Sequence, residues 1–179
     1  NINEVSKILN TSTSNRVAIC NANTLVRSVR DQNTKNLINN FTIKTPDGFP
    51  VAKALSMLTK QKFSRVDGYN VFLQTINDGL DKGKKHYFFG NNKATTLLMI
   101  DKLNTMFPEI KIVGHLCPEF LSGGELVAKY KKVFETIDAD IVWVSLGFPK
   151  QEVFIDNLCN EIELSTNFVG IGAVFDWVA

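Results

Sequence analysis

Strand-like apolar runs alternate with helix-like segments along the whole chain, and this alternation constrains the fold more than any other feature. The runs RVAICNA, HYFFGNN, IKIVGHL and DIVWVSLG are short, mainly apolar and typical of buried strands. The segments between them have helical apolar spacing and are long enough to cross back over a sheet. This order predicts right-handed β-α-β units. We therefore expect a Rossmann-like α/β fold, with a mostly parallel sheet and helices on both faces.

Element boundaries follow from local signals. Two helical pieces are expected within 23–40, with a break near Asp31, and a brief strand over 41–44. A helix is expected from Pro50, and the run NFVGIGAVFD, 167–176, is expected to be the last strand. No repeat, low-complexity tract or linker interrupts this order. Residues 1–179 are therefore predicted to form a single domain.

Composition excludes several classes of function. The 20 basic and 18 acidic residues give a net charge of only +2, so the overall charge does not favour nucleic acid as a partner. Three widely spaced cysteines indicate neither a disulfide framework nor a zinc site, and two histidines exclude a histidine-rich metal centre. We expect neither a signal peptide nor a membrane-spanning helix, because no apolar run approaches the ~18 residues that such a helix needs.

Chemistry-bearing residues recur where the predicted strands end. Ligands of open parallel α/β sheets bind beyond the carboxyl ends of the strands, where loops lead into helix N-termini. Glycine there lets a ligand approach the backbone, and a helix N-terminus favours phosphate. The candidate residues at these ends are Asn21, Asp47, Gly90, Asn91, Gln151, Gly172 and Asp176.

Asp47, in TPDGFPVAKAL, has two interpretations that the local sequence leaves open. An aspartate directly before a run of helix formers is a good N-cap, because its carboxylate accepts from an unpaired backbone N–H. The flanking Pro46 and Gly48 could instead present the carboxylate at a loop tip for chemistry. The two roles are compatible, since one rigid loop could hold the side chain for either.

Arg65 and Gln151 carry side chains suited to a nucleotide-sugar. Arg65 lies in the loop SRVDGYN, where its guanidinium could hold a phosphate or pair with a surface acid. Gln151, in the first helical turn of PKQEVFI, could offer a donor and an acceptor to a sugar or base. The neighbouring Glu152 is interpreted as a good first-turn residue, because acids suit that end of a helix.

Other patterns argue against a cofactor or a metal. The turn FFGNNKATT could hold a diphosphate, but it lacks Gly-X-Gly-X-X-Gly, which disfavours an NAD-type oxidoreductase. Asp138 and Asp140 form an Asp-X-Asp pattern before a strand, at the wrong end of the sheet for a ligand site. We interpret that pattern as a solvated turn and expect neither a cofactor nor a metal.

Six segments, in order over roughly residues 15–179, resemble the WecG/TagA/CpsF family of bacterial glycosyltransferases. They are NAN, TPDG, SRVDGYNVF, YFFGNNKATTLLMIDKLNTMFPEIKIVG, DIVWVSLGFPKQEVFI and NFVGIGAVFDWVA. The resemblance implies transfer of a sugar, with inversion, from a UDP-sugar to a polyprenyl-diphosphate-linked sugar. N-acetylmannosamine is the sugar of the best-known members. The products would belong to teichoic acid or another cell-surface polysaccharide.

The resemblance also implies roles for individual residues. Asp47 matches the proposed catalytic base, and the residues placed around the nucleotide-sugar and acceptor are Asn21, Arg65, Gln151 and Asp176. An inverting transfer needs such a base to take the proton of the attacking hydroxyl. It also needs positive or donor groups to stabilise the departing diphosphate. Without a metal, Arg65 and helix N-termini would supply them.

The cellular setting is implied in the same way. The family acts at the cytoplasmic face of the bacterial plasma membrane and has an Arg-rich C-terminal appendage thought to dock there. We expect residues 1–179 to be a core that lacks this appendage and can self-associate as a homo-oligomer. A second hypothesis is a non-catalytic module that binds a nucleotide or sugar with the same strand-end loops.

Overall fold

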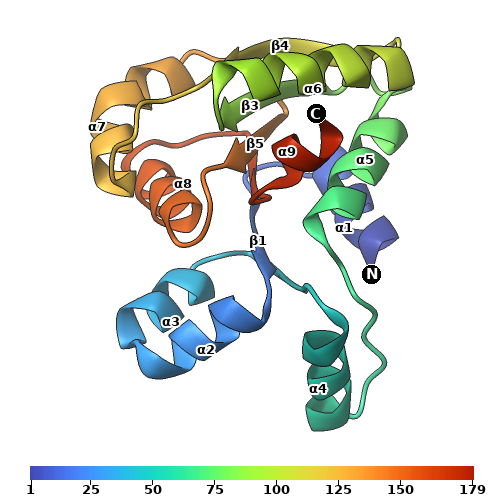
Figure 1. Ribbon diagram of the computed structural model, residues 1–179, viewed down its shortest axis with the longest axis vertical. Coiled ribbons are helices and arrows are strands. Elements are labelled where there is room, and N and C mark those ends of the chain that lie inside the picture. Colours follow the sequence, from blue (N-terminus) through green and yellow to red (C-terminus); the bar gives the residue numbers. More distant parts are fainter.

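One six-stranded parallel sheet organises the computed structural model, which describes residues 1–179 (Figure 1). The strands lie in the order β2-β1-β6-β5-β3-β4, and every neighbouring pair is parallel. The strands are β1 (Arg16–Cys20), β2 (Ile43–Pro46), β3 (Lys85–Gly90), β4 (Lys111–Leu116), β5 (Ile141–Ser145) and β6 (Asn167–Gly170). The helices are α1 (Ile2–Thr11), α2 (Ala22–Arg30), α3 (Gln32–Asn39), α4 (Phe49–Thr59), α5 (Gly68–Gly79), α6 (Lys93–Met106), α7 (Gly123–Phe134), α8 (Lys150–Glu161) and α9 (Val174–Val178).

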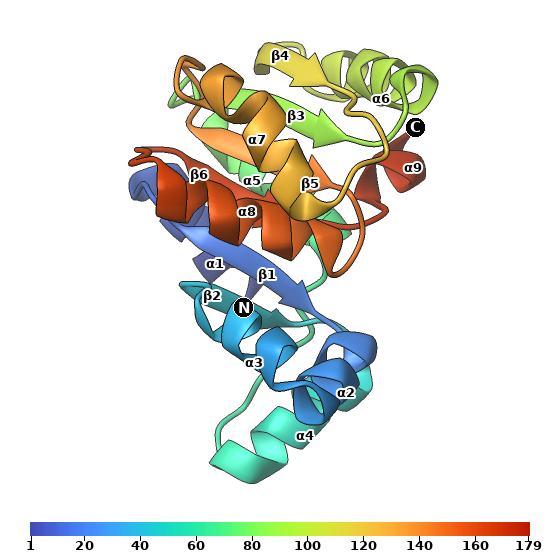
Figure 2. The same ribbon diagram turned by 90° about the vertical axis from the view of Figure 1, so that its left-hand side faces the viewer.

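Helices cover both faces of this sheet, so the expected Rossmann-like α/β architecture is confirmed. Figures 1 and 2 show α1, α5, α6 and α9 on one face and α3, α7 and α8 on the other. Because side chains alternate along a strand, Phe88 belongs to the core cluster of the first face and Phe89 to that of the second. Both rings are fully buried. All six carboxyl ends lie at one edge of the sheet, where the sequence predicts a ligand site.

The expected last strand is wrong beyond its fourth residue. Strand β6 ends at Gly170, and Val174–Val178 forms the short helix α9. Gly172 has φ +60° in the intervening turn, a left-handed conformation that favours glycine. Val174 and Phe175 are buried in the core of the first face. A short buried helix is therefore as apolar in sequence as a buried strand, which explains the wrong prediction.

The boundaries around residue 45 also differ from the expected ones. Strand β2 covers Ile43–Pro46 rather than 41–44, and α4 begins at Phe49. The break near Asp31 is confirmed, since this residue ends α2 and caps α3, accepting from the Thr34 backbone N–H at 2.8 Å. No helix is both long and apolar enough to cross a bilayer.

Candidate functional site

Four of the predicted site residues line one pocket at the carboxyl edge of the sheet. The pocket has a volume of about 220 Å³ and lies beyond the ends of β1, β2 and β6. Its predicted lining residues are Asn21, Asp47, Gln151 and Gly172. These residues are far apart in the sequence and meet because parallel strands end at a common edge.

Asp47 is held in this pocket by the backbone. Its N–H donates to the Cys20 carbonyl at 2.9 Å, which fixes the end of β2 beside the end of β1. The N-cap position of α4 belongs to Gly48, with φ +96°, and no side chain caps that helix. Of the two interpretations of Asp47, the N-cap is therefore wrong, because Asp47 lies one residue before the N-cap position. Asp47 lines the pocket instead.

Arg65 is the side-chain partner of Asp47. The Arg65 Nε donates to the Asp47 Oδ1 at 3.3 Å and lies 3.7 Å from the Asp67 Oδ2. The next residue, Val66, donates its N–H to the Pro46 carbonyl at 2.9 Å, so the backbone carries Arg65 to this place. Arg65 does not line the pocket itself, and its side chain is more exposed than that of Asp47, 56% against 24%.

Asn21 opens α2 and keeps one amide group unused. Its Oδ1 accepts from the Thr24 backbone N–H at 3.1 Å, an N-cap bond. Its Nδ2 has no hydrogen-bond partner in the chain, and the residue is exposed. Asn21 can therefore donate a hydrogen bond to a molecule in the pocket without giving up its structural role.

Both the oxygen and the nitrogen of the Gln151 side-chain amide form hydrogen bonds within the protein. Its Oε1 accepts from the Gly172 N–H at 3.0 Å, and its Nε2 donates to the Glu152 Oε1 at 2.9 Å. The side chain is buried. It thus fixes the turn after β6 and orients a carboxyl group, and only the second Nε2 hydrogen remains for a ligand.

Glu152 lines the same pocket and was missed as a site residue from the sequence. It is 1% exposed, and its Oε2 has no hydrogen-bond partner. Burial raises the pKa of this carboxyl to about 7, although the Gln151 hydrogen bond acts in the opposite direction. An acid in a first helical turn is an ordinary sequence signal. The sequence does not show that this turn is buried, because its burial comes from the packing of α8 on β1 and β6.

Asn91 and Asp176 meet outside this pocket. The Asn91 Nδ2 donates to the Asp176 Oδ2 at 2.9 Å, which ties the turn after β3 to α9. Gly90 begins that turn with φ +129°, packed against the Ser145 backbone. These three predicted residues therefore form a second group, and α9 connects it to the pocket through Trp177, which is 62% exposed and was also missed from the sequence.

The Asp-X-Asp pattern lies at the opposite edge of the sheet and is engaged in ion pairs. Asp140 accepts from Lys84 Nζ at 2.9 Å and from the Lys85 N–H at 2.8 Å, while Asp138 pairs with the Lys85 ammonium group. No three His, Cys, Asp or Glu side chains are grouped as metal ligands would be. Both aspartates thus tie the amino ends of β3 and β5 together.

Comparison with known proteins finds both relatives and a family for this chain. Two curated relatives, from Bacillus subtilis and Bacillus spizizenii, are both named N-acetylglucosaminyldiphosphoundecaprenol N-acetyl-beta-D-mannosaminyltransferase. They are 27% and 31% identical over 149 and 134 residues. The matches cover 83% and 73% of this chain but 56% and 49% of the relatives, so the chain spans about half the length of the curated relatives it matches. A family model matches residues 1–179, and the chain belongs to the WecG/TagA/CpsF family of glycosyl transferases.

Proposed function

We propose that this chain is the core of an inverting glycosyltransferase. The donor would be a UDP-sugar, with N-acetylmannosamine as the first candidate sugar, and the acceptor a polyprenyl-diphosphate-linked N-acetylglucosamine. The reaction would take place at the cytoplasmic face of the plasma membrane, in synthesis of a cell-surface polysaccharide or teichoic acid. The names of the two relatives support the sugar and the acceptor.

The pocket around Asp47 is the observation that carries this proposal. In the proposed step, the Asp47 carboxylate takes the proton of an acceptor hydroxyl, whose oxygen attacks the anomeric carbon of the donor. A new C–O bond forms on one face of the sugar while the bond to the UDP oxygen breaks on the other, which inverts the centre. The UDP leaves with the electron pair of the broken bond.

The neighbouring groups have roles that match this step. Arg65, beside the carboxylate, orients it and presents a positive charge to the diphosphate. The free amide of Asn21 can donate to the substrate, and the exposed Trp177 ring can stack on a base or sugar. Donors placed where negative charge develops stabilise a transition state most.

An assay of Asp47→Asn tests the proposal. The full-length protein would be given UDP-N-acetylmannosamine and a polyprenyl-diphosphate-N-acetylglucosamine, with UDP release and glycolipid product both measured. Because general-base catalysis contributes roughly 10²- to 10⁴-fold, we expect the variant to lose at least about 100-fold in kcat while still binding UDP. Asp101→Asn, on the exposed surface of α6, is the matched control and should keep full activity.

Two results would count against the proposal in different ways. Transfer by Asp47→Asn at the rate of the natural protein would remove Asp47 from the role of base. Binding of UDP by the natural protein without transfer from any UDP-sugar would favour the second hypothesis, a non-catalytic nucleotide- or sugar-binding module.

A further inference from the structure

Charge is segregated along this chain although its net charge is small. Residues 22–65 hold eight of the 20 basic residues but only two of the 18 acidic ones, a net charge of +6. The rest of the chain therefore carries a net charge of −4. This segment comprises α2, α3, β2, α4 and the loop that follows. It forms the β2 edge of the molecule, which we call the basic face (Figure 2).

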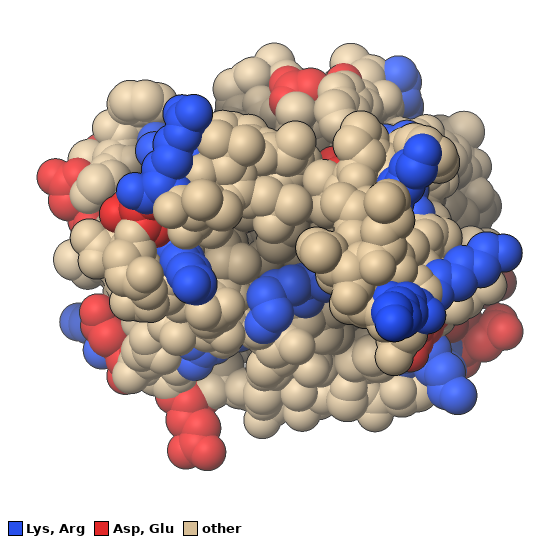
Figure 3. Space-filling view, turned by 90° about the horizontal axis from the view of Figure 1, so that it is seen from below, with Lys and Arg blue, Asp and Glu red and all other residues tan.

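The cations of the basic face are exposed and mostly unpaired. Figure 3 views the molecule from the side of this face, with Lys and Arg atoms spread over it and most acidic atoms toward its rim. Of the eight, only Arg65 has a carboxylate within 4.0 Å. The eight exposed residues are Arg27, Arg30, Lys35, Lys44, Lys53, Lys60, Lys62 and Arg65.

Large apolar side chains are exposed among these cations. Helix α4 buries only Val51 and Ala52, although most of its residues are apolar. Met57 and Leu58 are 73% and 84% exposed on it, and Val29 on α2 is 87% exposed. In Figure 1, α4 stands apart from the other helices at the bottom of the molecule. An apolar helix with so little of its surface buried lacks a partner.

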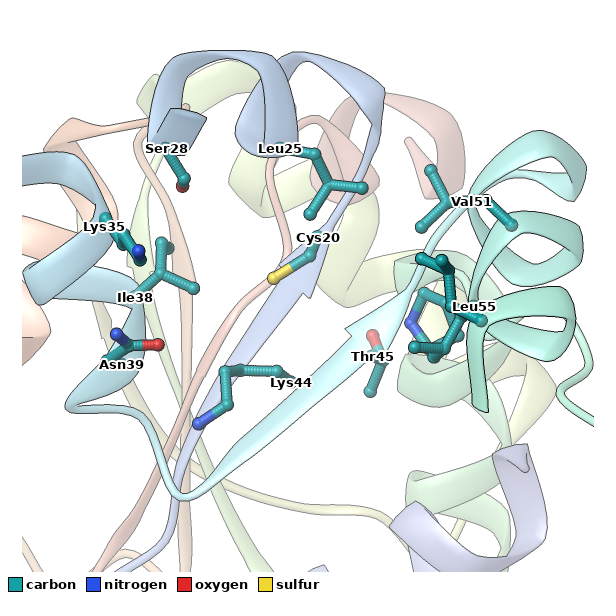
Figure 4. Close-up of a pocket in the computed structure, with 13 residues that line it drawn as sticks. Cys20, Leu25, Ser28, Lys35, Ile38, Asn39, Lys44, Thr45, Val51 and Leu55 are labelled. Carbon is teal, nitrogen blue, oxygen red and sulfur yellow. The ribbon is translucent and has the colours of Figure 1, made fainter. Parts of the chain in front are cut away.

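A groove of about 390 Å³ runs between these helices over β2 (Figure 4). Leu25 from α2, Ile38 from α3 and Leu55 from α4 form its walls, with Cys20 at its floor. The groove adjoins the candidate pocket. In three pairs of residues adjacent in sequence, one residue lines the groove and the other lines the pocket. These pairs are Cys20 with Asn21, Leu25 with Thr24, and Pro46 with Asp47.

We propose that the basic face docks on an anionic lipid bilayer, with α2 and α4 at the interface and the groove open to lipid chains. Exposed apolar side chains on interfacial helices enter the boundary between headgroups and acyl chains. Unpaired lysines and arginines add attraction to anionic headgroups, within about a Debye length of the surface. Both features occur together on this face, next to the pocket that holds Asp47.

A second copy of the chain fits this face less well than a bilayer does. A symmetric dimer through the basic face would bring two patches of net charge +6 together. Like charges facing one another without counter-charges oppose such an interface. An anionic surface instead meets the cations with the opposite charge, so charge complementarity selects the bilayer.

Vesicle binding by the full-length protein tests this proposal without any sugar transfer. The protein would be sedimented with vesicles of phosphatidylcholine alone or with phosphatidylglycerol added, at low and high salt. We expect binding to the anionic vesicles only, weakened by salt. The double variant Arg30→Glu with Lys53→Glu should bind at least about tenfold more weakly, because each surface cation adds attraction to anionic lipid.

Matched variants distinguish an effect of the basic face from effects of net charge and of exposed apolar side chains in general. Lys102→Glu with Lys132→Glu makes the same change in net charge elsewhere on the surface and should leave binding almost unchanged. Met57→Ser with Leu58→Ser should weaken binding, whereas Leu97→Ser with Leu98→Ser on α6 should not. Circular dichroism would establish that each variant is folded.

Two results would overturn the docking proposal. One is equal vesicle binding by both basic-face variants and their controls. The other is a change in oligomeric state, with no change in vesicle binding, when the basic-face residues are substituted. Because the proposal rests on the proposed function only for its biological setting, transfer to a short-chain, water-soluble acceptor is measured separately. If the basic-face variants lose vesicle binding and the natural protein shows no transfer activity, the docking proposal is supported and the proposed function is rejected.

Discussion

At the scale of the residue, Glu152 shows how burial changes an ordinary side chain. Its carboxyl is enclosed in the first turn of α8, with one oxygen held by Gln151 and the other unpartnered. Burial disfavours the ionised form, so the pKa rises from 4.5 to about 7. The folded protein therefore binds a proton that the unfolded chain has already released between these two pH values.

We predict that Glu152→Gln changes the pH dependence of stability. In the natural protein, the stability that this carboxyl contributes is fully present below pH 4.5 and is lost as the pH rises through 7. Glutamine cannot ionise, so the free energy of unfolding of the variant should gain roughly 3 kcal/mol on that of the natural protein between pH 4.5 and 8. Urea unfolding at several pH values measures the difference.

The exposed carboxyl of Glu135 provides the matched control, and Glu135→Gln should show no such trend. A difference between Glu152→Gln and the natural protein that stays constant with pH would mean that Glu152 ionises normally in the folded state. The same titrations also bear on the proposed catalytic step, because Glu152 lines the pocket of Asp47. A neutral carboxyl there can donate a hydrogen bond, which an ionised one cannot.

At the scale of the element, the turn from β3 to α6 depends on close approach of two backbones. A Cβ added at Gly90 would lie 2.2 Å from the Ser145 carbonyl oxygen, and the φ of +129° is rare for residues with side chains. The sequence offers this glycine as a site for a diphosphate. The structure adds a packing reason, because β5 lies directly against the end of β3.

We predict that Gly90→Ala lowers the free energy of unfolding by about 3 kcal/mol or more, since strain and overlap with backbone add. Gly147→Ala is the control, because φ there is +76° but no atom lies within 4 Å of the added Cβ. It should cost only about 1 kcal/mol for its left-handed backbone. Equal losses in the two variants, measured by chemical unfolding, would show that Ser145 moves aside.

Helix α9 is an element whose type could not be predicted from its local sequence. Its residues Val174, Phe175 and Val178 are apolar because they pack on the first core face. A short apolar run is compatible with a buried strand or a buried helix, and periodicity cannot separate the two. The preceding Gly172, with φ +60°, is the one local signal of a turn before this helix.

At the scale of the whole molecule, one sheet separates two hydrophobic cores, and both cores pack on that same sheet. Ile76 of α5 is fully buried on one face and Ile155 of α8 on the other. Stacked layers lie about 10 Å apart, so the two side chains have no neighbours in common. Their contributions to stability should therefore be independent, although the sheet makes unfolding a single event.

We predict that Ile76→Val and Ile155→Val each lower the free energy of unfolding by about 1 kcal/mol. In the double variant the two losses should add to within about 0.5 kcal/mol, because the sites are distant. Fluorescence of the buried Trp143 and circular dichroism should report one shared transition. Two separate transitions would instead show that the faces unfold independently.

Much of the architecture and part of the site could be predicted from the sequence. The alternation of strands and helices led to a parallel sheet, and the strand-end rule led to Asn21, Asp47 and Gln151 in one pocket. The site was not predicted as a whole, because Asn91 and Asp176 form a group of their own. Sequence order says which residues reach an edge of the sheet but not which of them touch.

The sequence by itself determined the class of fold, the family and the edge of the sheet that bears the candidate site, because these depend on periodicity and on motifs in order. Only the tertiary structure decided how the polar groups are used. It pairs Asp47 with Arg65, engages Gln151 with Gly172 and buries Glu152. It also gathers the cations of 22–65 on one face. Hydrogen bonds, desolvation and surface charge depend on distances between residues remote in sequence, and folding sets those distances.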